Sequence, residues 1–186
     1  RFLFISAIIP NISDINRWFG GAVGEVGNST YRPCKIRFAL AMEADGHIVV
    51  QYANDAIDDW SVKVNDFLND RQAKQVGTTQ RSLSCALSLK AMEAGPVMLY
   101  CSMKDGPRGC VKHAEELLNM LGESVFKNPF SFVQDVDWLS KVAEYCAYQF
   151  GDDYRLTQCV KKGFAYHHGQ MPQDIRELIE TAIAKK

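Results

Sequence analysis

The stretch Gly95-Pro96-Val97-Met98-Leu99-Tyr100-Cys101-Ser102 decides how the second half of the chain is expected to fold. Its Gly-Pro pair ends the helical pattern that precedes it, because neither residue favours continuation of a helix. The five apolar residues that follow form a short continuous run, which is typical of a strand buried on both faces of a parallel sheet. The sequence therefore predicts a strand at 97–101.

Helical patterns lie on both sides of this strand. Apolar side chains at helical spacing predict helices over 79–94, 111–121 and 137–150, and a last helix that starts after Pro172. A second short strand is expected at 164–166. Because strands alternating with helices favour right-handed crossovers, the predicted fold class is α/β, with a parallel sheet flanked by helices.

The beginning of the chain predicts a strand and a helix. The run Phe2-Leu3-Phe4-Ile5 continues through 9 without polar alternation, which favours another buried strand. A short helix follows Pro10-Asn11 and ends at Gly20-Gly21. Its apolar residues are expected to face inward, and these are Ile12, Ile15, Trp18 and Phe19.

The middle of the chain predicts a hairpin followed by a short helix. Apolar residues alternate on both sides of Ala44-Asp45-Gly46, so an antiparallel hairpin is expected over 35–53. The polar stretch that follows is expected to hold a short helix, whose apolar residues are Trp60, Val64, Phe67 and Leu68.

Composition excludes several classes of protein. The 186 residues are 47% hydrophobic and carry a net charge of -1, so neither a disordered chain nor a wholly basic nucleic-acid binder is expected. No apolar run approaches the ~20 residues that span a bilayer, so no membrane partner is expected. The six cysteines form no C-x-x-C pair and have no zinc-site spacing, which favours reduced thiols in a cytoplasmic protein over a disulfide framework.

The sequence contains none of three common catalytic motifs. It has no G-x-x-x-x-G-K-[ST] phosphate loop, no D-E-x-H tetrad for Mg²⁺ and no G-x-S-x-G nucleophile elbow. Three other short elements carry possible chemistry, and each also has a plain structural interpretation as a turn.

The first two elements follow predicted strands. Ser6-Ala7-Ile8-Ile9-Pro10-Asn11 brings a small hydroxyl residue to a strand end, where ligands of open α/β sheets gather. After the strand at 97–101, Ser102, Lys104 and the free N–H groups at the start of the next helix predict a phosphate-contacting cluster.

The third element is the most specific. It reads Gly163-Phe164-Ala165-Tyr166-His167-His168-Gly169-Gln170-Met171 and continues to Arg176 and Glu180. Adjacent histidines on a strand point to opposite faces, so no shared metal is expected. Gly169 permits an unusual backbone angle, and Arg176 is expected to reach a phosphate or Glu180.

In this order the elements resemble the superfamily 2 helicases, specifically the superkiller-like relatives of the DEAD/DEAH-box branch. The family motif S-A-T-x-P-N is similar to 6–11, and W-[LF]-G is similar to 18–20. An R-P connection is similar to Arg32-Pro33, and the family's G-[VF]-A-x-H-H-x-G signature with its later R and E is similar to 163–180. Residues 54–77 match nothing in the family pattern.

The resemblance implies a RecA-like sheet and an ATP-dependent helicase or translocase acting on DNA or RNA. It implies that 1–30 end a first RecA-like domain, that 31–77 form a hairpin-containing connection, and that 78–186 begin a second such domain. ATP and Mg²⁺ would be bound by the parent protein, in flanking RecA-like segments that are partners of this one. This chain alone is expected to bind neither of them and to be inactive as an ATPase.

Residue roles also come from the resemblance. Ser6 and Ala7 are implied to couple ATP hydrolysis to movement, although Ile8 replaces the threonine of the family motif. Contact with the nucleic-acid strand is implied for seven residues, which are Cys101, Ser102, Lys104, His167, His168, Gly169 and Arg176.

Two other functions remain open. The loss of the threonine at Ile8 is consistent with a non-catalytic binding or scaffold module derived from a helicase. A small metal-binding regulator that uses Cys159, His167 and His168 is the third hypothesis, and it requires stoichiometric zinc.

Overall fold

The computed structural model describes residues 12–18, 20, 38–44, 47–53, 63–64 and 66–184. The chain divides into two compact units, 1–37 and 38–186. The predicted strand at 2–9 lies outside the described residues, as do Phe19 and Trp60. The domain boundaries expected after residues 30 and 77 stay predictions.

The only element described in the first unit is helix α1, Ile12–Trp18. Gly20 follows it with φ at +75° and donates its N–H to the carbonyl of Arg17 at 3.0 Å, so the predicted glycine stop is confirmed. The prediction that Trp18 faces inward is wrong, because its side chain is 80% exposed. Periodicity identifies residues that share a helix face but does not reveal whether that face is covered.

The second unit begins with the predicted hairpin, which is confirmed. Strand β1, Phe38–Ala44, pairs antiparallel with β2, His47–Ala53, so that Met42 lies opposite Val49. A two-residue strand β3, Lys63–Val64, joins the other edge of β2. Val64 therefore lies in a strand and not in the predicted helix, because pairing with Val50 overrides its local pattern.

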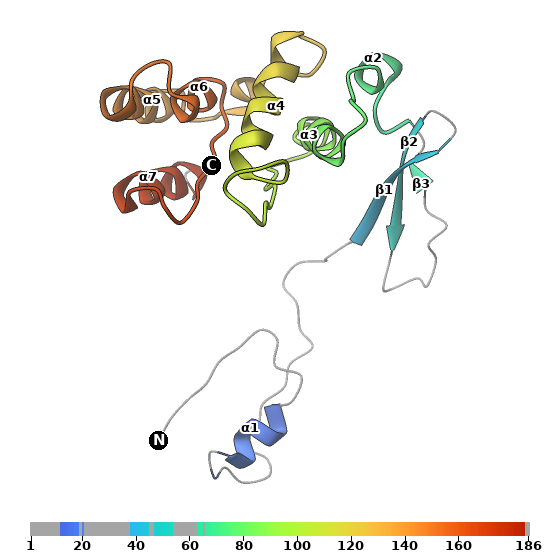
Figure 1. Cartoon of the computed structure of the whole chain (residues 1–186), viewed down its shortest axis with the longest axis horizontal. Coiled ribbons are helices and arrows are strands. Elements are labelled where there is room, and N and C mark those ends of the chain that lie inside the picture. The colour runs from blue at the N-terminus through green and yellow to red at the C-terminus, as the bar shows by residue number, and fades with distance from the viewer. Residues whose placement is uncertain are drawn as a thin grey trace. The chain divides into compact units, whose positions relative to one another are not determined.

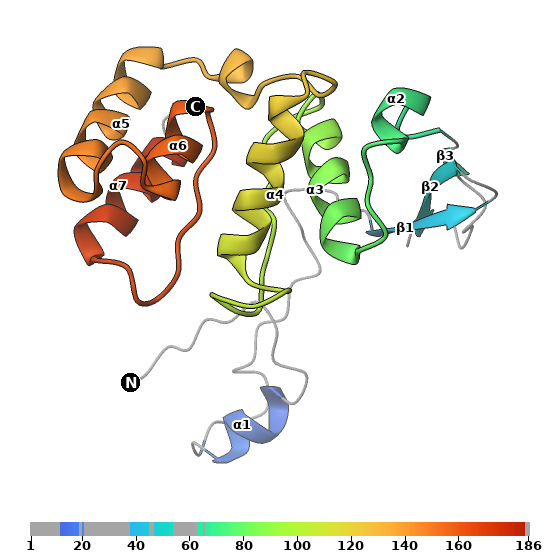
Figure 2. The same ribbon diagram turned by 45° about the horizontal axis from the view of Figure 1, so that its top comes forward.

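Helices make up the rest of the unit. They are α2 (Asp70–Ala73), α3 (Gln80–Ala91), α4 (Cys110–Gly122), the 3₁₀ helix η1 (Pro129–Phe132), α5 (Val136–Phe150), α6 (Arg155–Lys161) and α7 (Gln173–Ala184). Four of them, α3, α4, α5 and α7, confirm the helical predictions. Helix α4 contacts α3 on one side and α6 on the other, and both views show this order (Figures 1 and 2).

Two apolar clusters hold these helices. The first joins the hairpin to α3 and the end of α4, and its buried members include Ile48, Leu68, Cys85, Leu89, Met120 and Phe126. The second lies among α5, α6 and α7, and its buried members include Val142, Cys146, Leu156, Val160, Ile175 and Ile179. None of the helices in the described ranges has the length and apolarity needed to cross a membrane.

The described residues form a mixed α/β structure, but their one sheet is the three-stranded antiparallel sheet β1-β2-β3. The parallel sheet predicted from 97–101 and 164–166 is not found there, since neither segment is part of a ladder. The reason is physical: an apolar run favours extended backbone, but a strand also needs neighbours. Met98 and Tyr100 are 89% and 83% exposed, so one side of the first segment is open.

Three cysteines are expected to resist alkylation in the folded chain. Cys85, Cys146 and Cys159 are free and fully buried, and burial raises the pKa of Cys85 and Cys159 to about 12 and that of Cys146 in the same direction. Because the thiolate is the nucleophile, iodoacetamide at mildly alkaline pH should modify these three only after denaturation. Mass spectrometry of labelled peptides measures this, with the half-buried Cys101 and Cys110 as internal controls. Rapid labelling of Cys159 in the native chain would contradict the prediction.

Candidate nucleic-acid interface

The turn that follows 97–101 folds back onto the start of α4. Gly109 donates its N–H to the carbonyl of Gly106 at 2.9 Å, and Cys110 donates to Met103 at 2.9 Å. Val111 donates to the carbonyl of Lys104 at 3.3 Å. The expectation of free N–H groups for a phosphate is therefore wrong for Cys110 and Val111, because backbone carbonyls of the turn already occupy them.

Gly109 makes this close return possible. A Cβ atom at this buried position would lie 2.4 Å from the Lys104 carbonyl oxygen and 2.6 Å from the Asp105 carbonyl carbon. Both atoms belong to the backbone, which cannot move aside as a flexible side chain does. The turn can take this position only with glycine at 109.

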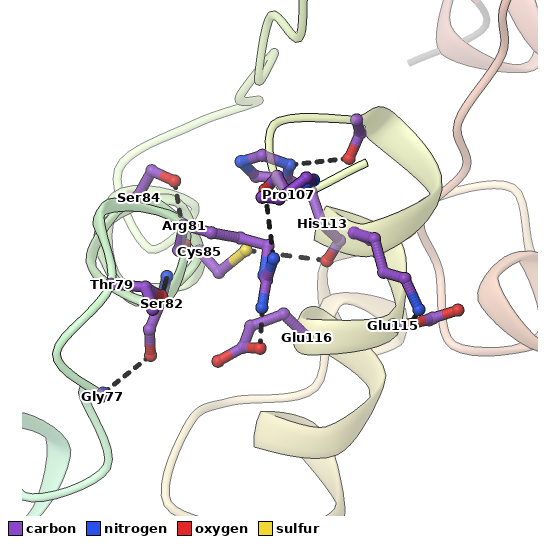
Figure 3. Close-up of polar contacts among 12 residues, drawn as sticks. Gly77, Thr79, Arg81, Ser82, Ser84, Cys85, Pro107, His113, Glu115 and Glu116 are labelled. Atoms are coloured by element: carbon purple, nitrogen blue, oxygen red, sulfur yellow. Dashed lines mark hydrogen bonds and ion pairs between the residues drawn. The ribbon is translucent and has the colours of Figure 1, made fainter. Parts of the chain in front are cut away.

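Side chains of α3 and α4 secure the same turn (Figure 3). Arg81 donates from Nη1 to the carbonyl of Pro107 at 3.0 Å, and its Nε lies 3.6 Å from a carboxylate oxygen of Glu116. His113 Nδ1 lies 2.8 Å from the carbonyl oxygen of Gly109. The turn is thus fixed to the two helices that support it.

Lys104 connects the second and third sequence elements. Its Nζ donates to Gln170 Oε1 at 2.8 Å, a contact across 66 residues of sequence, and lies 3.6 Å from Asp105 Oδ2. Gln170 follows the His167-His168-Gly169 stretch. The two turns therefore meet at one place on the surface, although their roles there stay predictions.

A pocket of about 590 Å³ opens beside this contact. Lys104, Gln170 and His168 line it together with residues from α4, the end of α5 and the start of α6. Its charged lining residues are Lys104, Asp105, Glu115, Asp153 and Arg155. Its aromatic lining residues are Phe150, Tyr154, Tyr166 and His168.

The two cations of the pocket are already partnered. Arg155 forms an ion pair with Glu115, and Lys104 contacts Gln170 and Asp105. The pKa of Glu115 is lowered, first by a hydrogen bond from Lys112 and further by Arg155, while partial desolvation opposes the shift. Three carboxylates against two cations leave the lining with an excess negative charge.

The aromatic residues form two ring pairs. The rings of Phe150 and Tyr154 stack with their centroids 4.7 Å apart, and those of Tyr166 and His168 stack at 6.4 Å, with the ring planes inclined by 29° in both pairs. Burial raises the pKa of Tyr166, as does a hydrogen bond with Tyr154. Burial and the nearby Lys104 lower the pKa of His168, and its Nδ1 has no hydrogen-bond partner.

The other predicted residues lie apart from this pocket. His167 Nε2 is 3.8 Å from Glu180 Oε1, so the adjacent histidines have different surroundings. Glu180 therefore contacts His167 and not Arg176, whose Nε is buried without a hydrogen-bond partner. The unusual backbone angle expected at Gly169 occurs instead at Gly163, where φ is +86°.

The remaining sites are placed as follows. Ser102 is exposed, and Cys101 is half-buried with a pKa that burial raises. Ser6 and Ala7 lie outside the described residues. Within the described ranges, no three His, Cys, Asp or Glu side chains group as a metal site requires.

Comparison with known proteins gives similarity to parts of two longer chains. Over 99% of its length this chain is 23% identical to the Hachiman protein HamB of Bacillus cereus. Over its whole length it is 25% identical to an ATP-dependent DNA helicase MER3 homolog of Oryza sativa subsp. japonica. It spans 17% of the first protein and 13% of the second. No family model and no solved structure matches.

This chain is thus related in sequence to a region of a DNA helicase. Sequence reasoning did not identify Tyr154, Arg155 or Gly109 as parts of the site. Tyr154 and Arg155 belong to the start of a helix that was not predicted, and the one available signal for Gly109 was its place before an amphipathic helix.

Proposed function

We propose that this chain is a core region of an ATP-dependent nucleic-acid helicase or translocase, of the superkiller-like branch, and that it supplies part of the nucleic-acid track. The observation that carries the proposal is the Lys104–Gln170 contact, because it joins the two motif-bearing turns at one surface. The similarity to a DNA helicase along the whole chain supports it.

In this proposal the phosphates of the nucleic-acid strand pass over the outer side of the turn at 102–109, which contains Lys104. Ser102 is exposed and lies two residues from Lys104, whose half-exposed ammonium group has three N–H donors and so can contact a phosphate oxygen while it keeps Gln170 and Asp105 as partners. His168 and Gln170 line the pocket beside Lys104. With a net charge of -1, the chain should bind weakly and with strong dependence on salt.

The proposed fold is a RecA-like domain in which 97–101 and 164–166 are strands of a parallel sheet. The continuous apolar run at 97–101 is the support for this proposal, and such a sheet would have to cover Met98 and Tyr100, which are exposed in this chain. Residues 1–30 would then belong to the preceding domain, with Ser6 and Ala7 coupling the two.

The residues of this chain do not fit ATP with Mg²⁺. The sequence has no phosphate loop, and no described cluster of carboxylates and histidines suits a metal ion. No step through the nucleotide is therefore assigned to these residues, and ATP hydrolysis is proposed only for a longer helicase chain.

Replacing Lys104 with alanine is expected to weaken binding of a single-stranded oligonucleotide roughly fivefold at low ionic strength and to reduce the salt slope by about 1. The reason is loss of one phosphate contact. Fluorescence anisotropy over a series of salt concentrations measures both quantities. Lys127→Ala is the matched control, because it removes the same charge from an exposed lysine near Glu93.

Two outcomes would count against the proposal. Equal weakening by both substitutions would show that only net charge matters. Absence of any binding by the unaltered chain, to DNA and to RNA, would favour the scaffold function that the change at Ile8 suggests.

A further inference from the structure

We propose that the pocket beside Lys104 receives one nucleobase of the bound strand, which stacks on the ring of Tyr154. This inference rests on the proposed function. It adds that the pocket recognises a base of the nucleic-acid strand rather than its backbone. Lys104 and Gln170 lie at the junction of the two turns, and Tyr154 comes from the start of α6.

The charges of the pocket disfavour a phosphate in its interior. Asp105, Glu115 and Asp153 outnumber Lys104 and Arg155, and Arg155 is paired with Glu115. A phosphate inside would lie among these carboxylates, and charges of the same sign repel. A nucleobase is flat, polar at its edges and uncharged at pH 7, so it enters without this penalty while its phosphate stays outside at Lys104.

The aromatic residues supply a surface for stacking. Tyr154 is 40% exposed, and its ring stacks with that of Phe150, which also lines the pocket, with the centroids 4.7 Å apart. Base stacking on such a ring is tolerant of sequence and strong enough to affect affinity.

The size of the pocket also suits this ligand. Its volume of about 590 Å³ is within the range of small-molecule sites and leaves room for a base with its sugar. The exposed carboxylates of Asp105 and Asp153 line the pocket and can accept the hydrogen bonds that exocyclic amino groups of bases donate.

The test uses the whole 186-residue chain and a single-stranded DNA oligonucleotide that carries 2-aminopurine at one central position. Stacking on Tyr154 should quench the fluorescence of this base when the strand binds. Tyr154→Ala should abolish the quenching and weaken binding roughly tenfold, whereas Tyr154→Phe keeps the ring and should retain both. Tyr148→Ala is the control, because Tyr148 is 85% exposed on α5 and does not line the pocket.

An oligonucleotide with a run of abasic sites separates the inference from the proposed function. The expected result is that the unaltered chain binds it roughly tenfold more weakly than the normal strand, with no further loss in Tyr154→Ala. Equal binding of normal and abasic strands would overturn the base pocket and leave the helicase track intact. Failure to bind either strand would instead overturn the proposed function.

A last experiment tests whether the pocket binds a base within a strand or a free nucleoside. Free 2-aminopurine riboside should be quenched only weakly, because it lacks the phosphate contact at Lys104. Strong quenching of the free nucleoside by the unaltered chain, together with none of the bound strand, would assign the pocket to a free nucleoside and overturn the inference. Circular dichroism and thermal melting of Tyr154→Ala establish that lost quenching does not come from unfolding.

Discussion

Replacing Gly163 with alanine is expected to lower the free energy of unfolding by about 3 kcal/mol. Gly163 has φ at +86°, and a Cβ atom there would lie 2.4 Å from the backbone nitrogen of Phe130. That nitrogen donates to the carbonyl of Lys162 at 2.9 Å, so the overlap also disrupts the hydrogen bond that ties η1 to the end of α6. Urea denaturation followed by circular dichroism measures the change.

Gly151→Ala is the matched control for Gly163→Ala. Gly151 also has a positive φ, +91°, but no atom lies within 4 Å of the position its Cβ would take. Only backbone strain applies there, but with ψ at 159° the residue lies in a region that is almost restricted to glycine, so the expected loss is about 2 kcal/mol. If both substitutions destabilise the chain equally, the close approach of Phe130 is not important for stability.

Replacing Gly109 with alanine is expected to destabilise the chain by a similar amount, about 3 kcal/mol, and also to weaken nucleic-acid binding. The added Cβ would overlap the backbone of Lys104 and Asp105, so the turn must move away from α4. Lys104 then loses its place beside Gln170, and the variant should bind oligonucleotides no better than Lys104→Ala does. Denaturation and anisotropy measured on the same sample give both effects.

Gly122→Ala serves as the comparison for Gly109→Ala. Gly122 lies at the other end of α4, and nothing lies within 4 Å of its Cβ position. Alanine is the better helix former, so this substitution should leave stability unchanged or raise it by up to ~1 kcal/mol. Unchanged binding in Gly109→Ala would contradict the role given to the turn.

The helices that sequence predicts well are those with one buried face. Helix α4 buries Ala114, Met120 and Leu121 and exposes Lys112 and Asn119, so its pattern has the helical period. Helix α6 was missed for the opposite reason. Four of its seven residues are buried, Leu156, Thr157, Cys159 and Val160, and such a short segment shows no amphipathic period.

The strands show a different limit of sequence reasoning. In the hairpin the turn and both partners are local, so the alternation on either side of Ala44-Asp45-Gly46 was enough to predict it. For 97–101 the apolar run indicates extended backbone but cannot name the neighbouring strands, and the described residues supply none. Pairing between distant segments depends on tertiary structure.

Sequence motifs indicate the two turns of the candidate site, but they do not indicate the residues that surround these turns. Lys104 and His168 were selected from local motifs, and the pocket contains both. Tyr154, Arg155 and Phe150 line it only because α6 packs beside α4 and α5 packs against α6, which no motif encodes. The occupied N–H groups of Cys110 and Val111 were equally hidden, because they depend on the path of the turn.

The long separation between Lys104 and Gln170 bears on the order of folding. Lys104 and Gln170 are 66 positions apart in the sequence, with α4, α5 and α6 between them, and closing so long a loop is entropically unfavourable until those helices have packed. The contact therefore forms late, after the intervening helices have assembled. A partly folded chain can contain every helix and still lack the pocket. Binding of a ligand in the pocket would therefore report the completed native state rather than secondary structure alone.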